Sequence, residues 1–269
     1  MSQPRSSPFS GCLASLPAEG LFSVWLGPVD GPPDFTREET APHYAASTMK
    51  LPVLITAHHA HDEGRIDLDS RVRVHDDFAS AADGSRFRMR QDYDNDDQVW
   101  DRIDLDAPLR WLVERMIVRS SNLATNLILE AVGVPAVQQT VCALCLHDSL
   151  VSRGIEDAAA REAGLDNLVS ARDLARALQS VIGSPEVLAT LSRQELRDTL
   201  PAGLPPGTRI AHKSGWVEGI THDAGIIFPE GADPFILVVC TTSGLSEAEG
   251  RDLIAHAANA AWQERGLPG

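Results

Sequence analysis

In "HYAASTMKLPVL", residues 43–54, small and polar residues give way to an apolar run. The change comes at Ser47, and the residues that follow it have the spacing of a helix buried on most of its surface. We predict a helix from about Ser47 to Glu63, ended by Gly64. Ser47 and Lys50 are three residues apart, so they share one face of that helix.

Outward from this helix, strand patterns lie at both ends of the chain. The stretch "GLFSVWLG" (20–27) alternates and is rich in aromatic and β-branched residues, which indicates a strand. Three further strands are predicted near the C-terminus, at 209–215, 223–229 and 234–244. A closing amphipathic helix follows, with Ser246 as its expected N-cap. Between residues 64 and 200 we find helical periods and loops, and no strand pattern.

This distribution predicts an α+β fold. One antiparallel sheet would be built from both termini and covered by helices, as an α/β sandwich formed by residues 18–64 and 203–269. Residues 65–202 would form an all-α domain inserted between them. The cleft where the two units meet is the expected place for an active site.

Composition limits the partners. The 269 residues include 43% hydrophobic and 23% charged residues, and the formal net charge is -15. Such a surface would be repelled by nucleic acid and by anionic membranes, so we expect neither as a partner. The first 20 residues lack the apolar core of a secretory signal, which favours a cytoplasmic protein.

The spacing of Ser47 and Lys50 suits nucleophilic catalysis. A serine hydroxyl needs a base to take its proton, and a lysine can serve when burial or a nearby positive charge lowers its pKa. Taken alone, S-x-x-K occurs often by chance. Its alternative interpretation is a capping serine beside a solvated lysine.

Two further stretches complete a pattern. "MIVRSSNLATNLIL" (116–129) places Ser120, Ser121 and Asn122 at a junction between two predicted helices. "AHKSGWVEGITHDAG" (211–225) places K-S-G at the end of a predicted strand. The ordered set S-x-x-K, S-x-N and K-S-G resembles the class A β-lactamases and penicillin-binding proteins, whose motifs are S-x-x-K, S-D-N and K-T-G. The resemblance covers nearly the whole chain and implies the serine β-lactamase-like fold.

The resemblance also implies roles. Ser47 would attack a carbonyl and become acylated, with Lys50 as a candidate base and Ser120 as proton relay to the leaving group. Asn122 would bind the substrate amide. A substrate carboxylate would be held by Lys213 and Ser214, and Gly215 would let the strand approach closely. Backbone N–H groups of Ser47 and Trp216 would form the oxyanion hole. The Trp216 side chain suggests a narrower or more apolar cleft than a small residue at this position would leave.

Two departures from the family pattern bear on deacylation. Ser121 replaces the aspartate of S-D-N. The E-x-x-L-N loop motif is matched only in part by "EAGLDN" (162–167), where the asparagine comes one residue later than in the motif. Candidate deacylation bases are Glu162 and, from another segment, His222. Glu156 is a less favoured candidate. The alternatives are a surface carboxylate for Glu162 and a packed histidine for His222. Without a positioned base, an acyl-enzyme formed from a β-lactam should hydrolyse slowly.

We therefore expect a serine hydrolase that acts through acyl-Ser47 on an amide, lactam or ester. A D-amino-acid amidase or an esterase falls within this class. The alternatives are an acyltransferase using the same intermediate and an inactive ligand-binding member of the fold. We expect a small-molecule substrate that can carry a carboxylate, and neither a cofactor nor a metal; the oligomeric state stays open.

Three other patterns receive structural interpretations. Cys142 and Cys145 have C-x-x-C spacing without a second pair, so we interpret them as small apolar positions on a helix. The acidic run "QDYDNDDQVWD" (91–101) is interpreted as a solvated loop. His58 and His61 lack a third metal ligand.

Overall fold

The computed structural model describes Phe9, Gly11 and residues 19–267. A five-stranded sheet has the order β2-β1-β11-β10-β9, and every neighbouring pair is antiparallel. Its strands are β1 (Leu21–Pro28), β2 (Phe35–Arg37), β9 (Arg209–Val217), β10 (Ile220–Phe228) and β11 (Phe235–Thr242). The predicted α+β architecture, with one sheet drawn from both ends of the chain, is confirmed.

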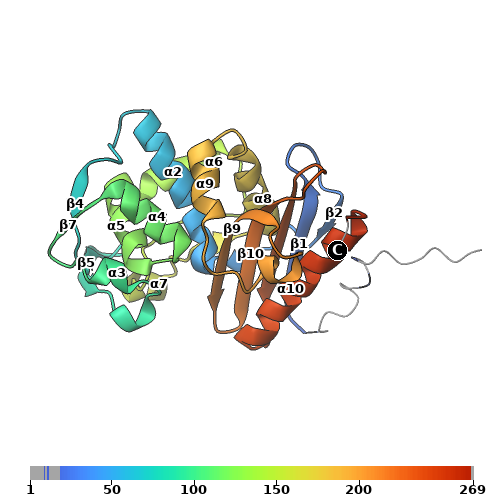
Figure 1. The fold of residues 1–269 in the computed structure, drawn as a ribbon. Helices are drawn as coiled ribbons and strands as arrows, with labels where there is room; N and C mark the ends of the chain where they lie inside the picture. The colour runs from blue at the N-terminus through green and yellow to red at the C-terminus, as the bar shows by residue number, and fades with distance from the viewer. Residues whose placement is uncertain (1–8, 10, 12–18, 268–269) are drawn as a thin grey trace, which may run out of the picture.

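Alternating side chains cover the two faces of the sheet with different helices. On one face, Leu237 and Val239 pack in a cluster with Ile254 of the C-terminal helix α10 (Glu247–Glu264). On the other face, Val238 belongs to the larger core that contains Leu174 of α8 (Ala171–Ser180). The period-two alternation of β11 therefore places α8 and α10 on opposite sides of the sheet. Figure 1 shows α10 lying across the outer face.

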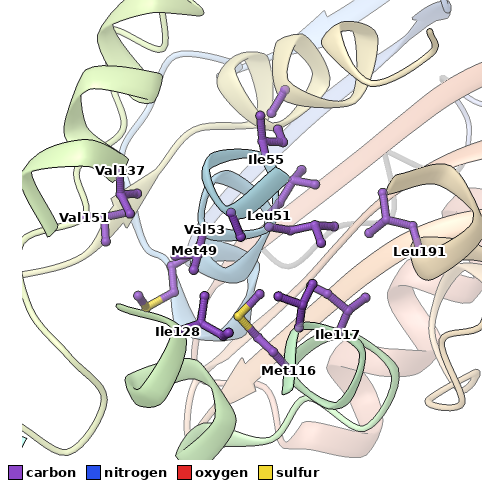
Figure 2. Close-up of a cluster of buried hydrophobic side chains, with 14 of the residues drawn as sticks. Met49, Leu51, Val53, Ile55, Met116, Ile117, Ile128, Val137, Val151 and Leu191 are labelled. Carbon is purple, nitrogen blue, oxygen red and sulfur yellow. The ribbon is translucent and has the colours of Figure 1, made fainter. Parts of the chain in front are cut away.

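The helical part of the molecule is built around α2 (Lys50–Asp62), the continuation of the stretch that opened the sequence analysis. Every residue of α2 from Lys50 to His58 is buried. Figure 2 shows Leu51, Val53 and Ile55 of this helix among side chains from several other elements. The helices among these elements are α4 (Leu109–Val118), α5 (Asn122–Val132), α6 (Val134–Ala143) and α9 (Pro185–Ser192). Burial on all sides fixes α2 firmly, which suits a helix that carries reactive groups.

The expectation of no strand between residues 64 and 200 was wrong. Five short strands occur there: β4 (Arg71–Arg73), β5 (Asp77–Ala79), β6 (Arg86–Arg88), β7 (Asp106–Pro108) and β8 (Leu168–Val169). They pair as β4 with β7, β5 with β6, and β8 with β3 (His43–Tyr44). Strands of two or three residues are too short to show an alternating pattern, so periodicity could not reveal them. The β3–β8 pair joins the segment before Ser47 to the segment after residue 167.

Short helices complete the chain: the 3₁₀ turns η1 (Ala46–Met49), η2 (Gln91–Tyr93) and η3 (Leu200–Gly203), and the helices α3 (Asp97–Trp100) and α7 (Ala158–Glu162). The expected N-cap of α10 is confirmed: Ser246 and Glu249 form a reciprocal capping box. Of the described helices, none has the length and apolarity needed to span a membrane. The prediction that there is no secretory signal rested on the first 20 residues, and most of these lie outside the described part of the chain.

The interpretation of the C-x-x-C pair as apolar helix positions was wrong in part. Cys142 lies in the last turn of α6 and Cys145 lies beyond its end, and both are exposed free thiols. The amide of Leu146 donates to Val141 O (2.9 Å) and that of Cys145 donates to Cys142 O (3.0 Å). This is a Schellman ending, and it turns the chain outward at Cys145, whose φ is +57°.

Candidate active site

Ser47 lies in η1, at the entrance to α2, with β9 directly beside it. A Cβ atom added at Gly215 would lie 2.7 Å from Ser47 N and 2.8 Å from Thr48 N. Only glycine allows this approach of strand to turn. The residue before the serine, Ala46, has φ +44°, a conformation that costs energy for a non-glycine residue. Ser47 itself is half-buried, and a short 3₁₀ turn carries it where the sequence suggested the first α-helical turn.

Lys50 is fully buried one turn below Ser47. Its Nζ donates to Ser120 O (2.7 Å), Asn122 Oδ1 (2.8 Å) and Ser120 Oγ (3.2 Å). Burial holds the pKa of Lys50 well below its ordinary value, and the nearby Lys213 lowers it further, although Asp94 opposes the shift. A lysine whose pKa is lowered in this way accepts a proton from a neighbouring hydroxyl more readily in its neutral form than a solvated lysine does. The structure thus brings together the lysine and two residues of the predicted S-x-N motif.

The turn that carries Ser120 and Asn122 is held by a residue that the sequence analysis did not single out. Asp94 accepts hydrogen bonds from Asn122 N (3.0 Å), Leu123 N (2.7 Å) and Ser121 Oγ (3.2 Å). The solvated-loop interpretation of residues 91–101 was therefore wrong in part. Two aspartates of that run face inward: Asp94 is half-buried, and Asp96 is buried against Arg115.

Lys213 and Ser214 lie buried on β9, next to Gly215. Burial lowers the pKa of Lys213 to about 7, while Asp223 acts in the opposite direction. The ammonium donates to Ser214 O (2.6 Å). With its amide nitrogen donating to Ile117 O, Gln194 also offers Lys213 Nζ an acceptor oxygen at 3.2 Å. The Ser214 hydroxyl is buried and has no hydrogen-bond partner among the described residues.

The side chain of Trp216 is directed toward α10. The guanidinium of Arg251, a residue of α10, lies 5.1 Å from the centre of the Trp216 ring. Since α10 covers the outer face of the sheet, this stacking gives no support to the expectation that the indole narrows the cleft (Figure 1). The Trp216 backbone remains on β9, one residue beyond Gly215.

His222 is a packed histidine, which was the alternative left open. Its Nε2 donates to Tyr44 O (3.0 Å), and its Nδ1 accepts from Thr241 N (3.1 Å). Both ring nitrogens are therefore occupied, and burial lowers the pKa to about 4. The ring also meets His43 edge-on at 5.3 Å. A histidine held in this way has no free lone pair for a water molecule.

The carboxylates after residue 155 do not reach the lysine. Glu162 is exposed at the last residue of α7, as its alternative interpretation stated. Glu156 accepts from Arg90 N (3.0 Å), and burial raises its pKa. Asp157 caps α7 and accepts from Ser80 Oγ (2.7 Å). Among the described residues, none of these three carboxylates has a hydrogen bond to Ser47 or Lys50.

The loop before α7 presents an apolar residue to the helix that carries Asn122. Ile155 N donates to Asn126 Oδ1 (2.8 Å), and Asn126 Nδ2 donates back to Ile155 O (2.9 Å). Asn126 lies one turn after Asn122 on the same face of α5. The Ile155 side chain packs against the main core. An isoleucine thus occupies the part of this loop that is held to the Asn122 face.

The histidines at the end of α2 do not form a joint site. His58 lies 3.7 Å from Glu186, whereas His61 groups with Asp67 and Asp69. Arg110 already donates to Asp69 at 2.7 Å and supplies the positive charge there. This arrangement gives no reason to propose a metal ion.

Comparison with known proteins agrees with the geometry. The model of the β-lactamase enzyme family matches residues 14–264. The chain is 27% identical over 248 residues to the extended-spectrum β-lactamase PER-1 of Pseudomonas aeruginosa, covering 81% of this chain and 73% of that protein. A β-lactamase of Sphaerobacter thermophilus has a similar structure, with a TM-score of 0.78, 23% identity and 97% of each chain covered. A PBP-A mutant, solved as an acyl-enzyme with penicillin G, has a TM-score of 0.78 and 22% identity over 98% of this chain and 99% of its own. The chain therefore belongs to the β-lactamase enzyme family and is a β-lactamase-like serine hydrolase.

Proposed function

We propose that this protein acylates Ser47 with a small amide, lactam or ester that carries a carboxylate, and that it hydrolyses the β-lactam acyl-enzyme slowly. The observation that carries the proposal is the burial of Lys50, whose Nζ reaches Ser120 and Asn122 while its pKa is strongly lowered. Such an amine is a proton acceptor adjacent to a serine on the same helix face.

In the proposed acylation, neutral Lys50 takes the proton of Ser47 as its oxygen attacks the carbonyl carbon. The negative charge on the carbonyl oxygen is stabilised by the backbone N–H groups of Ser47 and Trp216; removing one such donor typically costs about 3–4 kcal/mol. The bond to the leaving group then breaks. Ser120 passes a proton to the departing atom and is resupplied by Lys50, to which it is hydrogen-bonded.

The substrate carboxylate is assigned to β9. Lys213 and Ser214 are consecutive residues of this strand, and the buried Ser214 hydroxyl has no hydrogen-bond partner among the described residues. An ammonium and an unpartnered hydroxyl together suit a carboxylate, which accepts several hydrogen bonds. A negatively charged ligand would also raise the pKa of Lys213 from about 7 and so keep the ammonium charged.

Slow deacylation follows from what lies near Ser47 and Lys50. Hydrolysis of the ester needs a base that activates water. Glu162 is exposed on α7, both ring nitrogens of His222 are hydrogen-bonded, and Glu156 is held to Arg90 N by one carboxylate oxygen. The PBP-A mutant shows that a protein with this fold can hold penicillin G as an acyl-enzyme. The same observation favours acyl transfer as a second candidate function, because an amine or alcohol acceptor is a stronger nucleophile than unactivated water.

The test is an intact-mass time course with benzylpenicillin, with Ser47→Ala as control. We expect an adduct of one penicillin that persists for minutes or longer and is absent from Ser47→Ala. Adding a primary amine or alcohol should shorten its lifetime if acyl transfer is the reaction. Unmodified protein together with intact drug would contradict the assignment of β-lactams as substrates. An adduct that also forms on Ser47→Ala would contradict the assignment of Ser47.

A further inference from the structure

We propose that Asp94 is a positioning residue for acylation: it holds the turn from Ser120 to Leu123 in the shape that brings Ser120 and Asn122 to Lys50. The proposal rests on the proposed function for its catalytic readout. It assigns a role to a loop that the sequence suggested was only solvated.

The contacts of Asp94 converge on the start of α5. Its Oδ1 accepts from Asn122 N (3.0 Å), and its Oδ2 accepts from Leu123 N (2.7 Å) and Ser121 Oγ (3.2 Å). Free N–H groups at a helix start carry partial positive charge, so a carboxylate there is bound more strongly than a neutral acceptor. Trp100 Nε1 donates to the same Oδ2 (3.0 Å) and anchors the carboxylate from the far side.

The turn needs such support because its backbone is strained. Ser120 has φ +58°, in the left-handed region that serine rarely adopts. Conformations of this kind persist where the surroundings fix them from several directions. Here Lys50 binds the turn from one side, through Ser120 O, and Asp94 binds it from the other. The neighbour of Asp94 adds a further contact, since Asn122 Nδ2 donates to Tyr93 O (2.7 Å).

The Asp94 carboxylate can hold the start of α5 in place of the aspartate of the S-D-N motif, which this chain lacks. Ser121 is the N-cap of α5, and its hydroxyl accepts from Ala124 N (3.1 Å). A serine brings no charge to the turn, whereas Asp94 supplies a carboxylate one hydrogen bond away. Aspartate is also a good N-cap, so a carboxylate introduced at position 121 could bind the same helix start.

Asp94 also acts on Lys50 through its charge. Two charged side chains influence Lys50: Lys213 on β9 lowers its pKa, and Asp94 raises it. Replacing Asp94 by the isosteric, neutral asparagine should therefore lower the pKa of Lys50 further. A purely structural role would not produce such a shift.

The experiment compares Asp94→Asn with Asp92→Asn, a matched control in the same loop whose carboxylate is exposed and pairs with Arg90. Acylation of Ser47 is measured with benzylpenicillin and with an activated ester, across pH. We expect Ser47 of Asp94→Asn to be acylated at least tenfold more slowly at pH 7, with the acid limb of the pH–rate profile displaced to lower pH. Asp92→Asn should match the wild type. The double variant Asp94→Asn with Ser121→Asp should recover much of the loss.

Hydrogen exchange over residues 119–126 reports on the turn without any substrate. Exchange at the amides of Asn122 and Leu123 should be faster in Asp94→Asn and slower again in the double variant. Acylation of Ser47 at the wild-type rate in Asp94→Asn would overturn the proposal. A loss of acylation rate that the added Ser121→Asp substitution does not reduce would also overturn it. A wild type unreactive toward both reagents would instead contradict the proposed function; unchanged exchange in Asp94→Asn would then overturn the positioning role by itself.

Discussion

Two regions of the site differ in how completely they are built. Around Lys50, the amine donates to Ser120 O and Asn122 Oδ1, and the turn it binds is also held by Asp94. In the segment from Ile155 to Asn167, the carboxylates are exposed or bound elsewhere, and an isoleucine occupies the part of the loop held to α5. Under the proposed function, the first region serves acylation, while the second supplies no efficient base for deacylation. The two half-reactions of a serine hydrolase can therefore be present to different degrees in one fold.

The largest effect is expected when the first region is broken. Lys50→Met keeps the length of the side chain and removes its amine. Loss of a general base typically costs about 10²- to 10⁴-fold, so acylation of Ser47 should slow by that order. The measurement is the rate of adduct formation by mass spectrometry, with circular dichroism to verify the fold. Acylation within threefold of wild type would show that another group takes the proton.

The second region can be completed by adding the missing carboxylate. Ile155→Glu places one on the loop that is bound to the Asn122 face of α5, and Ile155→Gln is the isosteric control. If lack of a base limits hydrolysis, deacylation should accelerate by about 10²-fold in the glutamate variant only. The lifetime of the adduct measures this. Equal lifetimes in both variants would mean that the loop does not approach the ester.

A smaller effect is expected from Lys213. Because its pKa is about 7, the ammonium loses its charge as the pH rises above that value. The preference for a carboxylate-bearing substrate over a neutral ester should fall roughly fivefold from pH 7 to pH 8. Using this ratio cancels the titration of Lys50, which affects both substrates alike. A preference that stays constant with pH would place the carboxylate elsewhere; Lys213→Gln should abolish the pH dependence.

The smallest catalytic effect is expected at His222. His222→Gln should leave deacylation within about threefold of wild type, because the ring has no free nitrogen. Its effect should appear in stability instead. A tenfold change in the lifetime of the adduct would restore His222 as a base.

The buried pair His43 and His222 should make stability depend on pH. Burial lowers their pKa values to about 3 and about 4, below the ordinary 6.5, so the neutral rings stabilise the fold above pH 6.5. This stabilisation is lost as the pH falls from 6.5 toward 3, by on the order of 3 kcal/mol at pH 4 for His222 alone. Urea unfolding at pH 7.5 and pH 4 measures it. The His222→Gln variant should lose less, and an equal loss would contradict the assignment.

The motifs and the long elements could be predicted from the sequence because each carries a local signal. Ser47, Lys50 and K-S-G stand at recognisable element boundaries, and the buried helix and terminal strands follow apolar periodicity. The structure brings Lys50 within hydrogen-bonding distance of Ser120 and Asn122, and it places Gly215 against Ser47.

Asp94 could not be predicted because nothing in an acidic run tells which carboxylate faces inward. That choice depends on the distant start of α5, some 28 residues later in the chain. The short strands depend in the same way on tertiary contacts. For Glu162 and His222, the sequence left two interpretations open, and only the hydrogen bonds and exposure of each side chain could separate them.

The proposed function requires acylation of Ser47 to be much faster than hydrolysis of the acyl-enzyme, so one experiment should follow both half-reactions. Stoichiometric benzylpenicillin is mixed with the protein, and acyl-enzyme and penicilloate are quantified together by quenched-flow mass spectrometry. We predict that acyl-Ser47 accumulates to nearly one equivalent before penicilloate appears. Penicilloate released at the rate of acylation, with no accumulated adduct, would contradict it and would show that an efficient base acts on the acyl-enzyme.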